Sequence, residues 1–291
     1  MWDLSKMEWL KKLFNFYLDA NIHVALGVYA LVQVTLMEYG LDYDQPISLA
    51  LFFGTIVEYG FIKYASLAKH YLFVKQKYLK LIQLFNFSCA LIAMYYVSQL
   101  NLKTVFVAAA LILVAFLYVV PSMTTKKNLR NLKGIKAFVV SLTWSVSTVL
   151  LPLLNNQVPI TDEVLIDLVQ RFLFILALMV PFEIRDLKFD EPDLRTIPQV
   201  LGINGSLFLG VILLVFFVVF GLLRPELNTN SLYVEWGIAL LLLLALGFTK
   251  ENQSRYYASF FVEGIPIVWW IGLLLVYEKS SIFRFIATFF S

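Results

Sequence analysis

The sequence is poor in charged residues and in side chains suited to thiol or metal chemistry. Only 15% of the 291 residues are charged, and the chain holds one cysteine and two histidines. A lone Cys89 in an apolar run cannot form an intrachain disulfide and is typical of a core residue rather than a nucleophile. Two histidines exclude a histidine-rich metal site. The sequence also has no phosphate-binding glycine loop, nucleophile elbow, zinc-ligand spacing or nucleic-acid-binding motif.

Apolar residues, in contrast, are abundant. They make up 60% of the chain, and the mean hydropathy is +0.78. So few polar residues cannot cover the surface of a soluble domain, which predicts an all-α polytopic membrane protein. The start of the chain is amphipathic and resembles no cleavable signal peptide, so residues 3–19 are expected to form an interfacial helix. The apolar face of that helix consists of Leu4, Met7, Leu10, Leu13 and Phe14.

Nine apolar segments approach the ~20 residues that a bilayer crossing needs. The loops between them are short, which predicts one membrane domain over residues 1–291. The expected spans cover residues 22–40, 46–66, 80–99, 103–121, 135–154, 163–182, 198–221, 230–249 and 258–277.

The positions of the lysines and arginines predict the orientation of these spans. With a cytoplasmic N-terminus, inner segments carry eighteen of them and outer segments four, and Arg171 lies inside a span. Basic residues concentrate on the cytoplasmic side of membrane proteins. We therefore expect a cytoplasmic N-terminus and an outer C-terminus, in a plasma (inner) membrane, with the acidic segment described next on the cytoplasmic side.

One stretch, from Pro181 to Gly202, concentrates acidic residues between two apolar runs. On a helix, Glu183, Asp186 and Asp190 stand at i, i+3 and i+7 and share one face, where like charges repel. A hard cation such as Mg²⁺ would convert this repulsion into binding. The alternative is a solvated acidic loop between two membrane helices, and the spacing alone leaves both open.

The same stretch resembles the second aspartate-rich motif of the UbiA superfamily of intramembrane prenyltransferases. The residues that carry the resemblance are Glu183, Ile184, Arg185, Asp186, Asp190, Arg195, Thr196, Ile197, Pro198, Leu201 and Gly202. The resemblance implies a nine-helix bundle around a central cavity. It also implies transfer of a prenyl group from a prenyl diphosphate to a hydrophobic, aromatic or lipid acceptor, with Mg²⁺ as cofactor and membrane lipids, not nucleic acid, as further partners.

Roles for individual residues follow from this resemblance. Asp186 and Asp190, assisted by Glu183, are expected to bind Mg²⁺, and Glu58 joins the two aspartates as a catalytic candidate. Arg185 is expected to face the diphosphate. The segment after the fourth span resembles a basic cytoplasmic loop of the family that follows a tyrosine. Its residues expected to bind diphosphate are Tyr118, Lys126, Lys127 and Lys133.

The first aspartate-rich motif of the family is not matched. Aligned on Gly54, the chain places Glu58 at the family's asparagine and Tyr59, Ile62 and Ser66 at its aspartates; an alternative register places Phe61 and Ala65 there. Neither register retains an aspartate. The first metal cluster is therefore expected to be reduced or absent, although the second motif could still hold one Mg²⁺.

Charged residues inside spans are functional candidates by default, because inserting them costs about 2.5–3.5 kcal/mol at a helix centre. Arg171 lies four residues after Asp167, which favours an ion pair between them. Glu38 and Glu263 lie near the expected ends of spans, where exposure would make them unremarkable. Glu58 is the residue that we retain as a functional candidate.

Two further functions are compatible with the sequence. Loss of the first motif favours a non-catalytic protein that binds an isoprenoid or a quinone-like lipid. A secondary transporter would use paired intramembrane charges for coupling, but corresponding interrupted spans in two halves of the chain are not evident. The UbiA resemblance favours the prenyltransferase.

Overall fold

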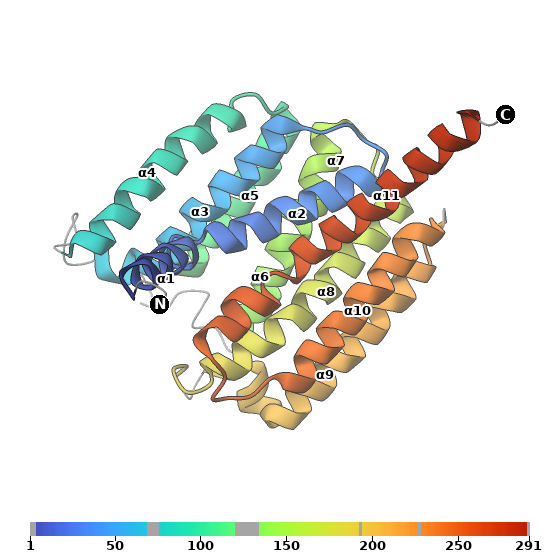
Figure 1. Ribbon diagram of the computed structural model, residues 1–291. Coiled ribbons are helices and arrows are strands. Elements are labelled where there is room, and N and C mark those ends of the chain that lie inside the picture. Colours follow the sequence, from blue (N-terminus) through green and yellow to red (C-terminus); the bar gives the residue numbers. More distant parts are fainter. Residues whose placement is uncertain (1–3, 69–75, 120–133, 192–193, 226–227, 290–291) are drawn as a thin grey trace.

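The structure, a computed structural model, describes residues 4–68, 76–119, 134–191, 194–225 and 228–289. Within these ranges the chain is helical, without a β-strand. The helices form one bundle with long, roughly antiparallel members (Figure 1). They are α1 (Leu4–Asp19), α2 (Ile22–Glu38), α3 (Gln45–Ala68), α4 (Lys77–Val97), α5 (Leu102–Val119), α6 (Lys136–Ser145), α7 (Leu151–Asn155), α8 (Asp162–Asp186), α9 (Ile197–Leu222), α10 (Thr229–Phe248) and α11 (Ile265–Phe289).

A helix begins at or near each of the nine expected spans, but the count of nine is not confirmed. Among the described residues, seven helices are long and apolar enough to cross a membrane, or eight if the bent pair α1 and α2 counts as one span. α2 alone has only 17 residues, and the described apolar part of α5 ends at Leu117. The chain is a multi-pass membrane protein with seven or eight candidate spans.

Two spans are assembled from shorter helices. A π-helical segment, Val146–Leu150, joins α6 to α7, and a second one, Tyr257–Val262, precedes α11. The helix expected over residues 3–19 is present as α1, and it meets α2 at 56°. Asn21 allows this bend because it adopts the left-handed conformation, with φ at 61°, which asparagine tolerates better than most residues. The Tyr17 hydroxyl group donates to His23 Nδ1 at 2.7 Å across the bend.

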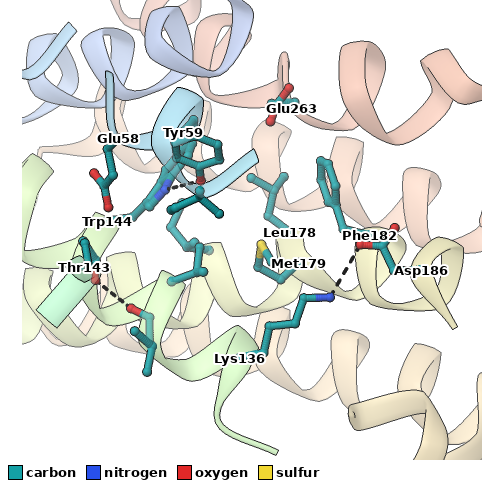
Figure 2. Close-up of a pocket in the computed structure, with 15 residues that line it drawn as sticks. Glu58, Tyr59, Lys136, Thr143, Trp144, Leu178, Met179, Phe182, Asp186 and Glu263 are labelled. Atoms are coloured by element: carbon teal, nitrogen blue, oxygen red, sulfur yellow. Dashed lines mark hydrogen bonds and ion pairs between the residues drawn. The ribbon is translucent and has the colours of Figure 1, made fainter. Parts of the chain in front are cut away.

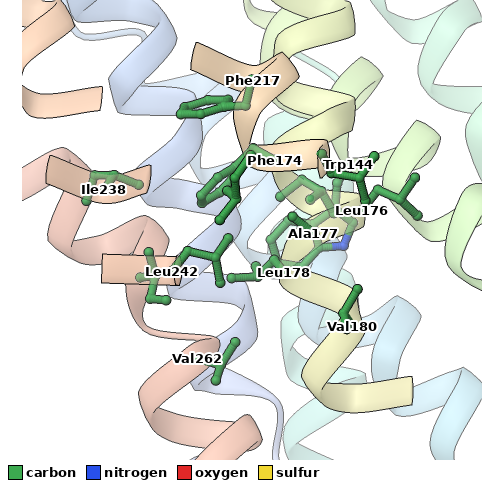
Figure 3. Close-up of a cluster of buried hydrophobic side chains, with 14 of the residues drawn as sticks. Trp144, Phe174, Leu176, Ala177, Leu178, Val180, Phe217, Ile238, Leu242 and Val262 are labelled. Atoms are coloured by element: carbon green, nitrogen blue, oxygen red, sulfur yellow. The ribbon is translucent and has the colours of Figure 1, made fainter. Parts of the chain in front are cut away.

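Helix α8 lies at the centre of the bundle. It packs against α6, α9 and α10 (Figure 1), and it has the largest buried share of the seven candidate spans. Its middle carries Phe174, whose ring lies 5.1 Å from that of Trp269 on α11 and 5.5 Å from that of Phe217 on α9. These rings belong to the main apolar core shown in Figure 3. Because apolar side chains pack around the middle of α8, the polar residues at its two ends are held in fixed positions.

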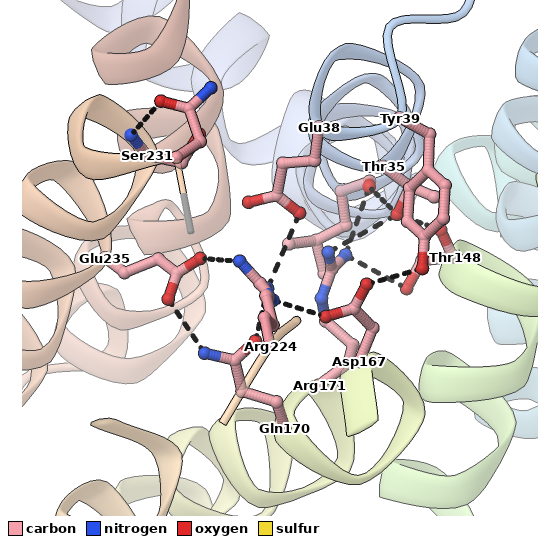
Figure 4. A network of polar contacts seen from close by, with 12 residues as sticks. Thr35, Glu38, Tyr39, Thr148, Asp167, Gln170, Arg171, Arg224, Ser231 and Glu235 are labelled. Atoms are coloured by element: carbon pink, nitrogen blue, oxygen red, sulfur yellow. Dashed lines mark hydrogen bonds and ion pairs between the residues drawn. The ribbon is translucent and has the colours of Figure 1, made fainter. Parts of the chain in front are cut away.

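An ionic network surrounds Arg224, in the turn between α9 and α10 (Figure 4). The guanidinium group donates to Asp167 at 2.6 Å and to Glu235, and it lies 3.8 Å from Glu38. Burial alone would lower the pKa of Arg224, but the carboxylates of Glu38, Glu235 and Asp167 raise it above its ordinary value. Arg224 is therefore charged, and it joins α2, α8 and α10.

Two expectations about charged residues are wrong. Glu38 is not exposed at a span end: 8% of its side chain is accessible, and it belongs to the network of Arg224. Arg171 does not pair with Asp167, because Asp167 binds Arg224 and accepts a hydrogen bond from Tyr39. Instead, Arg171 donates to the Leu31 carbonyl oxygen at 3.1 Å and to Thr148, and its guanidinium group lies over Trp269.

Removing the arginine from this network should destabilise the protein. Arg224→Gln would leave three carboxylates without their shared cation, and breaking a buried ion pair costs about 3–5 kcal/mol. We expect the variant to unfold at lower denaturant concentration in detergent or nanodiscs. Arg255→Gln is the matched control, because Arg255 is 57% exposed where it pairs with Asp19, and surface pairs contribute about 0–1 kcal/mol. Equal stability of the two variants would contradict the structural role.

Candidate functional site

A cavity of about 240 Å³ lies beside the C-terminal part of α8 (Figure 2). Its walls come from α3, α5, α6 and α8 and from the turn before α11. Most of the lining is apolar or aromatic, and Lys136 and Asp186 lie together at one end. An apolar chamber with a polar end suits an amphipathic ligand. The lining consists of Glu58, Tyr59, Ile62, Ala115, Lys136, Val139, Val140, Thr143, Trp144, Ile175, Leu178, Met179, Phe182, Asp186 and Glu263.

The three carboxylates of the acidic motif converge on one ammonium group. Lys136 Nζ lies 3.2 Å from Glu183, 3.5 Å from Asp186 and 3.4 Å from Asp190. The three acidic residues thus share one face, as their spacing predicts, although Asp190 lies beyond the end of α8. With three negative charges around one positive charge, the cluster has a net charge of −2 when all four groups are ionised.

The local fold of the chain holds this cluster together. Glu183 and Asp186 stand in the last turn of α8, and the backbone N–H of Asp190 donates to the Asp186 carbonyl oxygen at 2.9 Å. This hydrogen bond continues the helical turn past the end of α8 and keeps Asp190 on the same face as Asp186. Gly134, with φ at 74°, donates its N–H to the Leu194 carbonyl oxygen at 2.9 Å. The start of α6 is thereby attached to the acidic loop, and Lys136 is placed among the carboxylates.

Arg185 lies beside the cluster. Its Nε donates to Asp186 at 2.8 Å, and its Nη1 donates to Ser259 Oγ at 2.9 Å. Its guanidinium group also lies 5.2 Å from the centre of the Phe182 ring. Arg185 is therefore positioned next to Asp186, at the polar end of the cavity.

The donor set partly fits a divalent cation. Carboxylate oxygens are the ligands that Mg²⁺ prefers, and the cluster keeps a negative net charge even when Arg185 is counted with Lys136. Glu183 Oε1 is buried and accepts no hydrogen bond from any described residue, although Lys136 is 3.2 Å away. Among the described residues, however, no three acidic, histidine or cysteine side chains are arranged to hold a metal ion. The donors suit Mg²⁺, while their present arrangement surrounds an ammonium group.

The positions that correspond to the unmatched first motif line the same cavity. Glu58, Tyr59 and Ile62 of α3 all face it, opposite the acidic motif on α8. The Tyr59 hydroxyl oxygen accepts a hydrogen bond from Trp144 Nε1 at 3.0 Å. In the alternative register, Phe61 is 44% exposed and does not line the cavity. The register based on Gly54 is therefore the one that brings the first-motif positions to the cavity, where Glu58 is their one acidic residue.

The remaining expected diphosphate ligands cannot be placed. Lys126, Lys127 and Lys133 lie outside the described residues. Tyr118 lies near the end of α5, but its side chain falls outside the described part of the structure.

Three residues of the site were not singled out by the sequence as site residues. In the sequence, Lys136 is one of the basic residues expected on the inner side. Its position at the inner end of an expected span, on the same side of the membrane as the acidic motif, could have indicated a contact with that motif. Trp144 has no distinguishing local pattern. Glu263 was expected to be exposed near a span end, and this expectation is wrong: it lines the cavity, at the break before α11. The π-helical segment that places it there has no signature in the sequence.

Comparison with known proteins identifies the fold. No protein-family model and no curated protein matches the sequence. The apo structure of a UbiA homolog from Aeropyrum pernix K1 aligns over 87% of this chain and 98% of its own, with a TM-score of 0.65 and 13% identity. A digeranylgeranylglyceryl phosphate synthase aligns over 91% of this chain and 97% of its own, with a TM-score of 0.53 and 16% identity. The UbiA-like fold is thus confirmed.

Replacing Lys136 should reveal whether the carboxylates can bind a metal ion. In Lys136→Met, the three carboxylates lose their shared cation, so Mg²⁺ should stabilise the variant more than it stabilises the unmodified protein. At a concentration about 100 times Kd, bound Mg²⁺ would contribute about 2–3 kcal/mol, measurable as a shift of the unfolding temperature. Lys188→Met, at an exposed position of the turn after α8, should respond as the unmodified protein does. Equal Mg²⁺ responses in all three proteins would argue against a metal site.

Proposed function

We propose that this chain is a divergent member of the UbiA superfamily and transfers a prenyl group, within the membrane, from a prenyl diphosphate to an aromatic or lipid acceptor. The observation that carries the proposal is the convergence of Glu183, Asp186 and Asp190 at the polar end of an apolar cavity, inside a bundle of UbiA-like fold. The cavity suits the prenyl chain, and its polar end suits the diphosphate.

The chemistry requires charge neutralisation at that polar end. When the allylic C–O bond breaks, negative charge develops on the departing diphosphate, and cations nearby stabilise it. Lys136 and Arg185 are the basic residues held there, and Lys126, Lys127 and Lys133 would add positive charge from the preceding loop. When bound, Mg²⁺ would supply further neutralisation, and Glu183, Asp186 and Asp190 would hold it.

The walls of the cavity would contribute in a second way. The allylic group gains positive charge as its bond to diphosphate weakens, and aromatic faces attract cations. Tyr59 and Trp144, which are hydrogen-bonded to each other, and Phe182 provide such faces in the lining. The apolar lining also keeps water from competing with the acceptor. Glu58 is positioned in the same lining to receive a proton from the acceptor.

A non-catalytic role in binding an isoprenoid or a quinone-like lipid is the second candidate. It is favoured by the residues at the first-motif positions, where Tyr59 and Ile62 line the cavity without a carboxylate, and by the ammonium group of Lys136 within the acidic cluster. This role would retain the cavity and the affinity for lipid, without cleavage of the diphosphate.

The orientation also belongs to the proposal. The excess of lysines and arginines in alternate loops supports a cytoplasmic N-terminus, an outer C-terminus and a location in the plasma (inner) membrane. The acidic motif and the cavity would then open towards the cytoplasm, from which a water-soluble diphosphate headgroup arrives.

Neutralising the aspartates should weaken the Mg²⁺-dependent binding of a prenyl diphosphate. We expect Asp186→Asn and Asp190→Asn each to weaken binding of a farnesyl diphosphate analogue by at least about tenfold in the presence of Mg²⁺, because each removes one anionic ligand. In the unmodified protein, EDTA should produce a comparable loss. Binding to purified protein in nanodiscs, followed by isothermal titration calorimetry, is the measurement.

Asp42→Asn, an exposed position in the loop between α2 and α3, is the matched control and should bind as the unmodified protein does. Unchanged binding in both aspartate variants would remove these residues from the metal site. Tight binding that EDTA does not affect, without release of diphosphate when acceptors are added, would favour the lipid-binding role.

A further inference from the structure

Two further acidic side chains line the cavity. They are Glu58, from α3, and Glu263, from the break before α11 (Figure 2). Neither side chain makes a hydrogen bond or a close ion pair with any residue that the structure describes, although Arg185 and Lys63 attract the Glu263 carboxylate from a greater distance. Carboxyl groups enclosed by apolar walls normally have partners, because an unpaired polar group costs free energy. A ligand that supplies hydrogen-bond donors would satisfy both carboxyl groups.

The charges around the cavity restrict the nature of that ligand. Its lining contains three acidic residues, Glu58, Asp186 and Glu263, and one basic residue, Lys136. The ammonium group of Lys136 is already shared by three carboxylates, and Arg185 is held by Asp186 and Ser259. The charges of Arg185 and Lys63 also act on Glu263, but neither residue lines the cavity, and Lys63 is held by Asp19 at 3.4 Å. An anionic group placed beside Glu58 and Glu263 would be repelled, and walls of low polarity strengthen that repulsion.

We propose that Glu58 and Glu263 form a specificity-determining subsite that selects a neutral acceptor bearing hydroxyl groups, of the alcohol or phenol type, over an acceptor that carries a carboxylate. The inference rests on the proposed prenyltransferase function and names the acceptor class that this function uses. Hydroxyl groups of such an acceptor donate to the two carboxyl groups, and its apolar body contacts Tyr59 and Trp144. A carboxylate has no proton to donate and adds charge of the same sign.

The two positions also explain why one glutamate would not suffice. Glu58 belongs to the α3 wall, whereas Glu263 comes from a segment about two hundred residues later in the sequence. Carboxyl groups on two different walls can hold an acceptor at two points and thereby fix its orientation relative to the diphosphate end. Such positioning is a large part of the catalytic effect in reactions between two bound molecules.

A matched pair of ligands tests the selection directly. 4-Hydroxybenzyl alcohol and 4-hydroxybenzoate share a phenol ring. Opposite the phenol hydroxyl group, the first carries a neutral hydroxymethyl group and the second a carboxylate. We expect the purified protein in nanodiscs, with EDTA and without prenyl diphosphate, to bind the alcohol at least about tenfold more tightly than the benzoate. Equal affinities, tighter binding of the benzoate, or binding of neither ligand would each overturn the inference.

Isosteric variants test whether Glu58 and Glu263 cause the preference for the alcohol. Glu58→Gln and Glu263→Gln should each reduce the preference for the alcohol, chiefly by improving the binding of the benzoate, because each removes a negative charge and adds an amide donor. Glu8→Gln, an exposed acidic residue of α1, should leave the preference unchanged. The unfolding temperature of each variant checks that it is folded. A preference that persists in both cavity variants would remove these glutamates from the subsite.

The outcome separates this inference from the function on which it rests. If prenyl transfer occurs and the benzoate is the better acceptor, the subsite is wrong and the transferase remains. If the alcohol is preferred and both glutamine variants lose the preference, but no acceptor receives a prenyl group, the subsite stands as a binding site and the transferase proposal falls.

Discussion

Placing charged side chains inside a membrane bundle costs free energy, and the rest of this structure depends on how that cost is offset. The two ends of α8 offset it in the same way. At each end, one cation is shared by three carboxylates: Arg224 near Asp167, and Lys136 near Glu183. Asp167 and Glu183 are sixteen residues apart, or about 24 Å along the helix. The core around Phe174 lies between them and fixes both ends relative to each other.

The two clusters differ in their surroundings. In each, one buried carboxylate oxygen, of Glu38 near Arg224 and of Glu183 near Lys136, accepts no hydrogen bond from the described residues. Around Arg224, however, Gln170 and Tyr39 provide further hydrogen bonds from neighbouring helices, whereas the cluster around Lys136 borders a cavity. A network enclosed by helices holds them together, and one beside a cavity is able to respond to a ligand. The same arrangement of charges can thus be structural at one end and functional at the other.

The sequence predicts features that depend on residues close together in the chain, and it does not predict contacts between segments that are far apart in the chain. Helix positions and the convergence of Glu183, Asp186 and Asp190 depend on periodicity over a few residues, which the sequence displays directly. The predicted ion pair between Arg171 and Asp167 is wrong because the i, i+4 rule considers only neighbours on one helix. Asp167 is instead bound by Arg224, which lies 57 residues later in the sequence. Glu263 was missed for a related reason, since a π-helical segment, invisible in the sequence, directs it into the cavity.

The network around Arg224 has a consequence for the biogenesis of the protein. Its carboxylates come from the second, eighth and tenth helices, so the cation that pairs Glu38 and Asp167 is synthesised only after both have left the ribosome. Until then, these acidic residues must reach the bilayer unpaired, protonated or sheltered by the insertion machinery. The last helices of the chain therefore do more than enlarge the bundle. Arg224, which follows α9, completes the pairing of acidic residues that belong to helices made earlier.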